Sequence, residues 1–272
     1  MGFGFRLKKR SRGSPASSYA GKPPAFFGEN KVADPSPSPR TNELGQPIGA
    51  ALDGWRPPPH PPRVTLQGRF CDVEPIDPDR HAAELHAANS LSPDDRLWTY
   101  LVCGPFESFD AYRTWMLEAC LGDDPQFYAI VERSSGDAIG VSSYMRIAPS
   151  AGAIEVGNLC FPPRLSQTPA ATEAMYLMMR NAFELGYRRY EWKCDSLNIP
   201  SRRAAERLGF IYEGLFRQAI VYKGRNRDTA WYAIIDQDWP KLADGFEQWL
   251  SSANFDESGA QRRSLADLRA GG

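Results

Sequence analysis

The segment NIPSRRAAERLGF, residues 198–210, carries the clearest start and stop signals for a helix in this chain. Asn198 is a typical N-cap residue, and Pro200 fits the first helical turn, where no backbone N–H is needed. Gly209 ends the helix, because glycine readily adopts the left-handed conformation found at helix C-termini. Strands are predicted on both sides of this helix, over residues 188–194 and 211–221.

Several polar side chains follow on this predicted helix. Ser201 places a hydroxyl near its start, three residues after Asn198. Arg202, Arg203 and Arg207 could bind a phosphate group through paired hydrogen bonds, or they could line a solvated helix face. The residue pattern alone leaves both interpretations open.

A second strand–loop–helix unit precedes this one. Residues 153–161 predict a strand, and residues 170–185 predict an amphipathic helix that Gly186 ends. The connecting loop leads into a helix N-terminus, whose free N–H groups and positive dipole suit a phosphate. Arg164 could add charge there, although a plain strand–helix connection has the same pattern. Neither a GxGxxG fingerprint nor a P-loop occurs in the chain.

Glu155 is an acidic residue inside the apolar strand of this unit. A solvent-facing or ion-paired carboxylate explains such a position, and so does a catalytic one. The sequence does not decide between these roles.

The remaining elements complete a mixed sheet. Antiparallel hairpins come first and strand–helix units later, which predicts an α/β or α+β domain with a mixed sheet. The other predicted strands cover residues 64–76, 127–131, 139–147 and 229–235, and the other helices cover residues 78–89, 109–119 and 239–250.

Composition divides the 272 residues into an arm and a domain. Residues 1–63 hold 12 of the 23 prolines, with ten Lys and Arg against four Asp and Glu, a local charge of +6. The net charge of −1 then leaves −7 on the rest of the chain. We expect residues 1–40 to be disordered and residues 41–63 to form an extended strap. Its expected anchors are Leu44, Ile48, Leu52 and Trp55.

Other features limit the class of protein. No run of about 18 apolar residues predicts a membrane span, and the near-neutral net charge argues against a global nucleic-acid interaction. The five cysteines are widely spaced and lack metal-site patterns, so we expect no metal and a reducing, cytoplasmic location. Organelle targeting by the basic first twelve residues remains an alternative. A domain over residues 64–252 and a polar tail over residues 253–272 are expected.

These motifs together resemble a known family. The order Glu155-Val156-Gly157, a phosphate-type loop ending Thr172-Glu173-Ala174, Asn198-x-x-Ser201 and Arg207-Leu208-Gly209-Phe210 resembles the GNAT superfamily of acetyl-CoA-dependent N-acetyltransferases. It is most similar to the branch of ribosomal-protein N-terminal acetyltransferases (RimJ/RimL-like). The resemblance spans about residues 66–239. It implies a mixed, mostly antiparallel sheet of about seven strands with helices on both faces.

The resemblance also implies a site. Two central strands separate, and the pantetheine arm of acetyl-CoA lies in the gap. Ser201 is then the general acid for the leaving thiolate, and Glu155 is the best candidate to take the amine proton. Direct attack by the amine needs no covalent intermediate, so Cys160 and Cys194 are expected to be packing residues. The residues expected to bind acetyl-CoA are Leu159, Phe161, Arg164, Gln167, Thr168, Ala170, Ala171, Thr172, Asn198 and Ser201.

The expected acceptor is a primary amine on a protein N-terminus or a small molecule, bound by a monomer or homodimer. Its candidate contacts are Trp98, Tyr100, Phe106 and Arg217. Basic residues in the same regions argue for a carboxylate or phosphate on the acceptor.

One departure from the family pattern concerns the phosphate loop. Its two usual glycines are replaced by Gln167 and Pro169, and proline supplies no amide. Either the loop follows another path, with Arg164, Gln167 and Thr168 compensating, or coenzyme A binds weakly. A noncatalytic coenzyme A-binding or interaction module that uses the proline-rich arm is therefore the alternative function.

Overall fold

The structure, a computed structural model, describes residues 40–270 and separates residues 40–54 from a body that begins at Trp55. The expected disorder of residues 1–39 lies outside the described residues. In the first part, β1 (Arg40–Thr41) and β2 (Pro47–Ile48) form a small antiparallel hairpin. Leu44, Ile48 and Leu52, three of the four expected anchors of the strap, lie in this first part, and their role as anchors stays a prediction.

The body is built on an eight-stranded sheet with the order β3-β4-β5-β6-β7-β8-β10-β9. All neighbouring strands are antiparallel except β7 and β8, which run parallel. The expected mixed, mostly antiparallel sheet is therefore confirmed, and the two-residue β3 adds a strand to the expected number. The strands are β3 (Leu66–Gln67), β4 (Cys71–Pro75), β5 (Gln126–Glu132), β6 (Ala138–Ala148), β7 (Ala153–Cys160), β8 (Arg189–Asp195), β9 (Ile211–Tyr222) and β10 (Arg225–Ile235).

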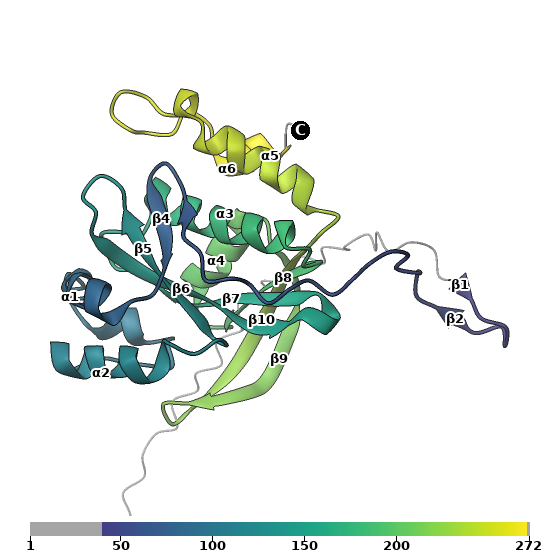
Figure 1. Cartoon of the computed structure of the whole chain (residues 1–272), viewed down its shortest axis with the longest axis horizontal. Helices are drawn as coiled ribbons and strands as arrows, with labels where there is room; N and C mark the ends of the chain where they lie inside the picture. Colours follow the sequence, from purple (N-terminus) through teal and green to yellow (C-terminus); the bar gives the residue numbers. More distant parts are fainter. Residues whose placement is uncertain (1–39, 271–272) are drawn as a thin grey trace, which may run out of the picture. The chain divides into compact units, whose positions relative to one another are not determined.

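Helices cover both faces of this sheet (Figure 1). One apolar cluster joins α1 (Pro78–Asn89) and α2 (Phe109–Ala119) to the first half of the sheet. A larger cluster on the other face contains α3 (Pro169–Glu184), α4 (Ile199–Leu208) and α5 (Trp239–Leu250). None of the helices within residues 40–270 is long and apolar enough to cross a membrane. The short helices are η1 (Asp95–Trp98), η2 (Pro149–Ala151), η3 (Ser252–Asn254) and α6 (Leu265–Ala270).

The helices begin where their capping residues predict. The side chains of Ser108, Thr168 and Asn198 each accept a hydrogen bond from the amide three residues later. Such a bond satisfies one of the free N–H groups of a helix start. Gly209 ends α4 at a φ of 102°, so the predicted left-handed C-cap is confirmed.

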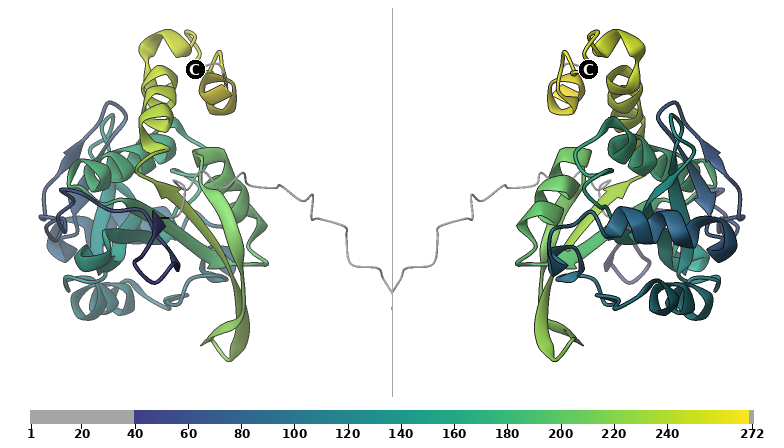
Figure 2. Two further views of the ribbon diagram at one scale, coloured as in Figure 1. Left: turned by 90° about the vertical axis from the view of Figure 1, so that its right-hand side faces the viewer. Right: turned by 90° about the vertical axis from the view of Figure 1, so that its left-hand side faces the viewer.

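The sheet ends in a long hairpin of β9 and β10 (Figure 2). Lys223 Nζ, in its turn, donates to the carbonyls of Trp98 and Cys103 at 2.8 and 2.9 Å. Arg225 Nη2 donates to the Thr99 carbonyl at 2.7 Å. The hairpin thereby holds the connection between α1 and α2 in place.

The chain crosses the body as an extended, proline-rich segment before β3. Pro58 and Pro61 are buried and Trp55 is half-buried, whereas the residues between them are exposed. This spacing of three matches polyproline geometry, in which every third residue shares one face. The buried side chains of Tyr187 and Gln126 donate hydrogen bonds to the carbonyls of Pro59 and Pro61, at 3.1 and 3.3 Å.

Tyr187→Phe is expected to lower the free energy of unfolding by about 1 kcal/mol, because it removes the hydrogen bond to Pro59 while keeping the buried ring. Equilibrium urea unfolding measures the change. Tyr212→Phe is the matched control, because the ring of Tyr212 packs against Tyr232 while no hydrogen bond to the Tyr212 hydroxyl occurs within residues 40–270. Equal stability of the two variants would show that the carbonyl contact does not hold the segment.

Residues 253–270 continue the fold instead of forming a polar tail. Leu265 and Leu268 of α6 are buried in the larger core cluster. Trp249 Nε1 donates to Gln261 Oε1 at 2.7 Å, and the buried Asn254 amide donates to the carbonyl of Arg263. The polar composition of this segment concealed two apolar residues three positions apart, which is one face of a short helix.

Candidate functional site

Two central strands separate at the middle of the sheet. β7 and β8 pair from Ala153 with Arg189 as far as Val156 with Trp192, and within the described chain no pairing joins them beyond this point. Asn158 has a positive φ of 51°, and the register between β6 and β7 shifts beside it. Such a bulge bends a strand away from its neighbour. The second half of β7 therefore leaves β8, as the resemblance implies.

Ser201 lies at the point of separation. Its Oγ accepts a hydrogen bond from Nε1 of Trp192, the last paired residue of β8, at 3.1 Å. A hydroxyl has one donor and two acceptor positions, so its O–H can still donate to a ligand. Asn198 uses its side-chain carbonyl to cap α4, at 3.1 Å from the Ser201 amide. The Asn198 side-chain NH₂ has no acceptor within residues 40–270.

The loop between β7 and α3 forms a compact turn. Gln167 has a φ of 63°, in the left-handed region that glycine adopts without strain. The Thr168 amide donates to the Leu165 carbonyl at 3.2 Å, and the Ala171 amide donates to Thr168 Oγ1 at 3.2 Å. Two of the amides expected to bind phosphate are thus engaged within the protein. Leu159 and Phe161, at the end of β7, are half-buried.

Arg164 does not face this loop as a free cation, and its expected role in binding phosphate stays a prediction. Its guanidinium contacts Glu132 and Asp137 of the β5–β6 turn, at 2.6 and 2.7 Å, and donates to Ser135 at 2.7 Å. These partners raise the pKa of Arg164, mainly through the hydrogen bond to Glu132. Arg164 therefore joins the loop to a hairpin.

Glu155 is a buried member of an ion-pair network, and its expected role as the base stays a prediction. Arg146 Nη1 lies 2.7 Å from both of its oxygens, and Lys193 Nζ lies 2.9 Å from one of them. Lys193 also contacts Glu191 at 2.7 Å and is only 6% exposed. Both oxygens of Glu155 are occupied by cations, and its strand position lies before the separation. A structural ion pair is the simpler interpretation.

The four expected acceptor contacts do not form one group. Trp98 is buried and packs against Phe106, with ring centroids 5.3 Å apart, so both belong to the core around α2. The Tyr100 hydroxyl donates to the Leu197 carbonyl at 3.1 Å and joins the α1–α2 connection to the residue before Asn198. Arg217 is exposed on β9. Only the first three lie in one region.

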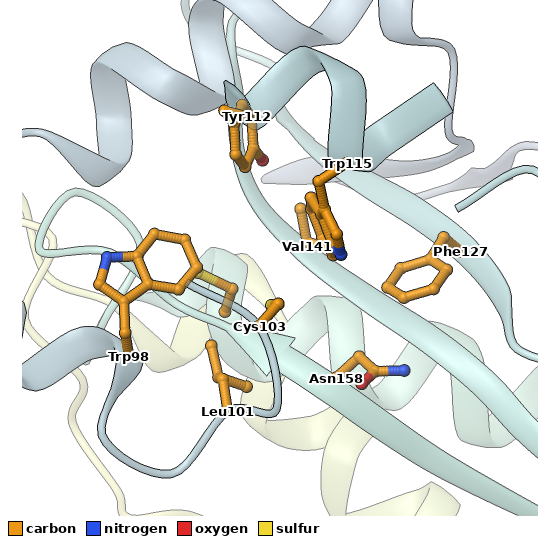
Figure 3. Close-up of a pocket in the computed structure, with 9 residues that line it drawn as sticks. Trp98, Leu101, Cys103, Tyr112, Trp115, Phe127, Val141 and Asn158 are labelled. Carbon is orange, nitrogen blue, oxygen red and sulfur yellow. The ribbon is translucent and has the colours of Figure 1, made fainter. Parts of the chain in front are cut away.

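A small apolar cavity adjoins the separated part of β7 (Figure 3). Its volume is about 10 Å³, close to the space one water molecule needs. Trp98 lies on one side of it and Asn158 on the other, and Tyr112 and Trp115 of α2 lie above (Figure 3).

Burial keeps the nearby thiols protonated. It raises the pKa of Cys160 and that of Cys194, although a hydrogen bond with Ser201 partly offsets the effect on Cys194. Neither thiol is therefore an activated nucleophile. All five cysteines are free.

Three residues of the site were missed in the sequence. The sequence indicates only that Trp192 is a core residue, whereas the structure shows that its indole N–H donates a hydrogen bond to Ser201. Lys193 follows it in β8 and pairs with Glu155. Asn158 carried a usable signal, because asparagine inside an apolar strand is a frequent choice where φ is positive.

Comparisons with known proteins agree with this geometry. The family model described as "Acetyltransferase (GNAT) domain" matches residues 73–211. A GCN5-related N-acetyltransferase from Brucella melitensis is 44% identical, with a TM-score of 0.79, and the match covers 80% of this chain and 100% of that one. A probable GNAT-family acetyltransferase from Chromobacterium violaceum is 40% identical, with a TM-score of 0.67, over 72% of this chain and 98% of that one.

A curated relative gives the same family. The uncharacterized N-acetyltransferase YnaD of Bacillus subtilis is 25% identical over 154 residues, which are 56% of this chain and 88% of YnaD. The family model spans half of the chain and includes the separated strands, the loop and α4. The chain therefore belongs to the GNAT acetyltransferase family and is an acyl-CoA-dependent acetyltransferase.

Proposed function

We propose that the protein transfers the acetyl group of acetyl-CoA to a primary amine by direct attack on the thioester. The observation that carries this proposal is the separation of β7 and β8 directly beside the Ser201 hydroxyl. The family supplies the cofactor class, and the separated strands supply a place for the pantetheine arm. The arm is proposed to lie along Leu159 and Phe161, with the side-chain amide of Asn198 as a donor to it.

The pyrophosphate is proposed to bind at the start of α3. The free end of this helix favours anions. Because the amides of Thr168 and Ala171 already have partners, Gln167 and Ala170 are left as the amide contacts of this group, and Thr172, whose hydroxyl accepts a hydrogen bond from Arg207, lies one turn further along α3. Arg164 is omitted, since its guanidinium is held by the β5–β6 turn.

The chemistry needs one proton donor from the protein. The amine nitrogen forms a bond to the thioester carbonyl carbon, and the C–S bond then breaks. Ser201 passes its proton to the departing thiolate sulfur and regains one from water, while the extra proton of the amine leaves to water. Buried, protonated Cys160 and Cys194 take no part.

The proposed acceptor is a protein N-terminus or a small-molecule amine. The RimJ/RimL-like assignment rests on Asn198-x-x-Ser201 and the following Leu208-Gly209-Phe210. Five free thiols fit a reducing compartment such as the cytoplasm.

One observation favours the alternative, a coenzyme A-binding module without activity. The loop before α3 uses two of its own amides, and Pro169 supplies none. Weaker binding of the phosphates by this loop would reduce turnover without changing the fold.

A binding and turnover experiment separates the two functions. Saturating acetyl-CoA is expected to raise the Tm by about 5–10 °C, because a ligand that binds only the folded state stabilises it. Free thiol is then expected to appear when peptides or small amines are added, and not with acetyl-CoA alone. Stabilisation without thiol release across both amine panels would support the module.

A further inference from the structure

Two arginines meet where α4, α5 and α6 lie together. Arg207 of α4 donates to Thr172 Oγ1 of α3 at 3.0 Å, and its guanidinium carbon lies 5.4 Å from the ring centre of Trp249. Arg269 of α6 passes over Gly209 and Gly245, where a Cβ would come within 2.5 and 2.7 Å of its side chain. The two glycines thus leave room for this side chain.

These arginines differ from the other perturbed arginines of the described chain. The pKa values of Arg96, Arg164, Arg189 and Arg202 are raised, because each has a carboxylate or tyrosine partner. Burial lowers the pKa of Arg207, and burial together with the charge of Arg207 lowers that of Arg269. Neither side chain has a carboxylate within 4 Å in residues 40–270, and the buried Nε of Arg269 has no acceptor there.

Capping of α4 does not account for the pair. Cations do favour helix C-termini. However, the Gly209 amide already binds the Glu206 carbonyl at 3.1 Å, and the Phe210 amide binds the Ala205 carbonyl at 3.0 Å. Two neighbouring guanidinium groups without an anion are costly when they are partly desolvated. The arrangement lacks a negative partner.

The location of the two arginines indicates which anion would bind to them. Thr172 lies one helical turn after Pro169, the first residue of α3, so Arg207 reaches close to the proposed pyrophosphate site. Arg207 is exposed and Arg269 half-buried, so a ligand can approach them. Coenzyme A carries a second phosphate, a monoester on its ribose, one sugar away from the pyrophosphate.

We propose that Arg207 and Arg269 form a phosphate-monoester site that binds the 3′-phosphate of coenzyme A. This inference rests on the proposed function, because it takes acetyl-CoA as the ligand. Arg269 lies outside residues 73–211, which the family model matches. Guanidinium groups suit this role, because they form paired, charge-assisted bonds to phosphate.

Calorimetric titration of the full chain with coenzyme A and with 3′-dephospho-coenzyme A tests the site. The wild type is expected to bind coenzyme A about 10- to 100-fold more tightly than 3′-dephospho-coenzyme A, because charged hydrogen bonds to the 3′-phosphate contribute that much to the affinity. Arg207→Gln and Arg269→Gln are each expected to reduce this ratio to about threefold or less, with the affinity for the dephospho form unchanged. Thermal unfolding of each variant confirms that it folds.

Lys241→Gln is the matched control, because it removes a positive charge from the exposed side of α5 and should keep the wild-type ratio. Equal binding of the two nucleotides by the wild type, with acetyl transfer intact, would overturn the site and leave the proposed function standing. No binding of either nucleotide would overturn the proposed function itself. Titration with inorganic phosphate completes the test: a response lost in Arg269→Gln, together with equal nucleotide binding, would assign the site to free phosphate and contradict our proposal.

Discussion

Ser201→Ala is expected to lower kcat for acetyl transfer about 100-fold, because the thiolate then leaves without a positioned proton donor. The Trp192 indole N–H occupies one acceptor position of the hydroxyl, and the O–H remains able to donate. The dissociation constant of acetyl-CoA should change by less than about threefold, since the hydroxyl acts mainly on the departing sulfur. Steady-state thiol release and calorimetric binding measure the two quantities.

A control on the same loop makes this result specific. Ser196 lies between β8 and α4, and its backbone amide, not its side chain, binds Asp228. Ser196→Ala should keep kcat within about twofold of the wild type. Equal kcat for Ser201→Ala and the wild type would remove Ser201 from the mechanism. A parallel loss of acetyl-CoA binding would instead make it a contact for the cofactor.

The features that local sequence encodes were predictable. Asn198, Thr168 and Ser108 cap helices as their residue types indicate, and Gly209 ends α4. Each of these signals depends on bonds between residues a few positions apart, so no knowledge of tertiary structure is needed.

The roles of charged residues were less predictable, because their partners lie far away in the sequence. Arg164 binds a turn about 30 residues earlier, and Glu155 is paired with Lys193 on the neighbouring strand. Both residues carry charges that suit phosphate or acid–base chemistry, so the sequence pattern was the same for a structural and a catalytic role. Gln167 shows the opposite case: the backbone keeps the glycine-like conformation although the glycine is absent.

Glu173 illustrates how a family marker can hide a structural function. In the sequence it served only as part of the Thr172-Glu173-Ala174 pattern that follows the phosphate loop. In the structure it is buried, and its carboxylate accepts the amides of Arg69, Phe70 and Cys71 at 2.8, 2.6 and 2.9 Å. The carboxylate thus joins α3 to the turn between β3 and β4.

Glu173→Ala is expected to lower the free energy of unfolding by roughly 4 kcal/mol, because the buried amide of Cys71 and the part-buried amides of Arg69 and Phe70 lose their acceptor and a cavity forms. Glu173→Gln should cost about half as much, since its amide carbonyl still accepts while its NH₂ faces donors. Glu184→Ala is the control on the exposed side of the same helix. The Glu184 carboxylate contacts only Arg180 within residues 40–270, at 3.8 Å, so its loss should change the free energy of unfolding by less than about 0.5 kcal/mol.

Equilibrium urea unfolding of these three variants gives the comparison. The turn held by Glu173 belongs to β3 and β4, far along the sheet order from β7 and β8, so kcat per folded molecule should stay near the wild-type value. A loss of stability with retained turnover would therefore show that Glu173 stabilises the fold. If Glu173→Ala were as stable as Glu184→Ala, the three short bonds would contribute nothing, and the turn would be held by the apolar contacts of Phe70 and Cys71 instead.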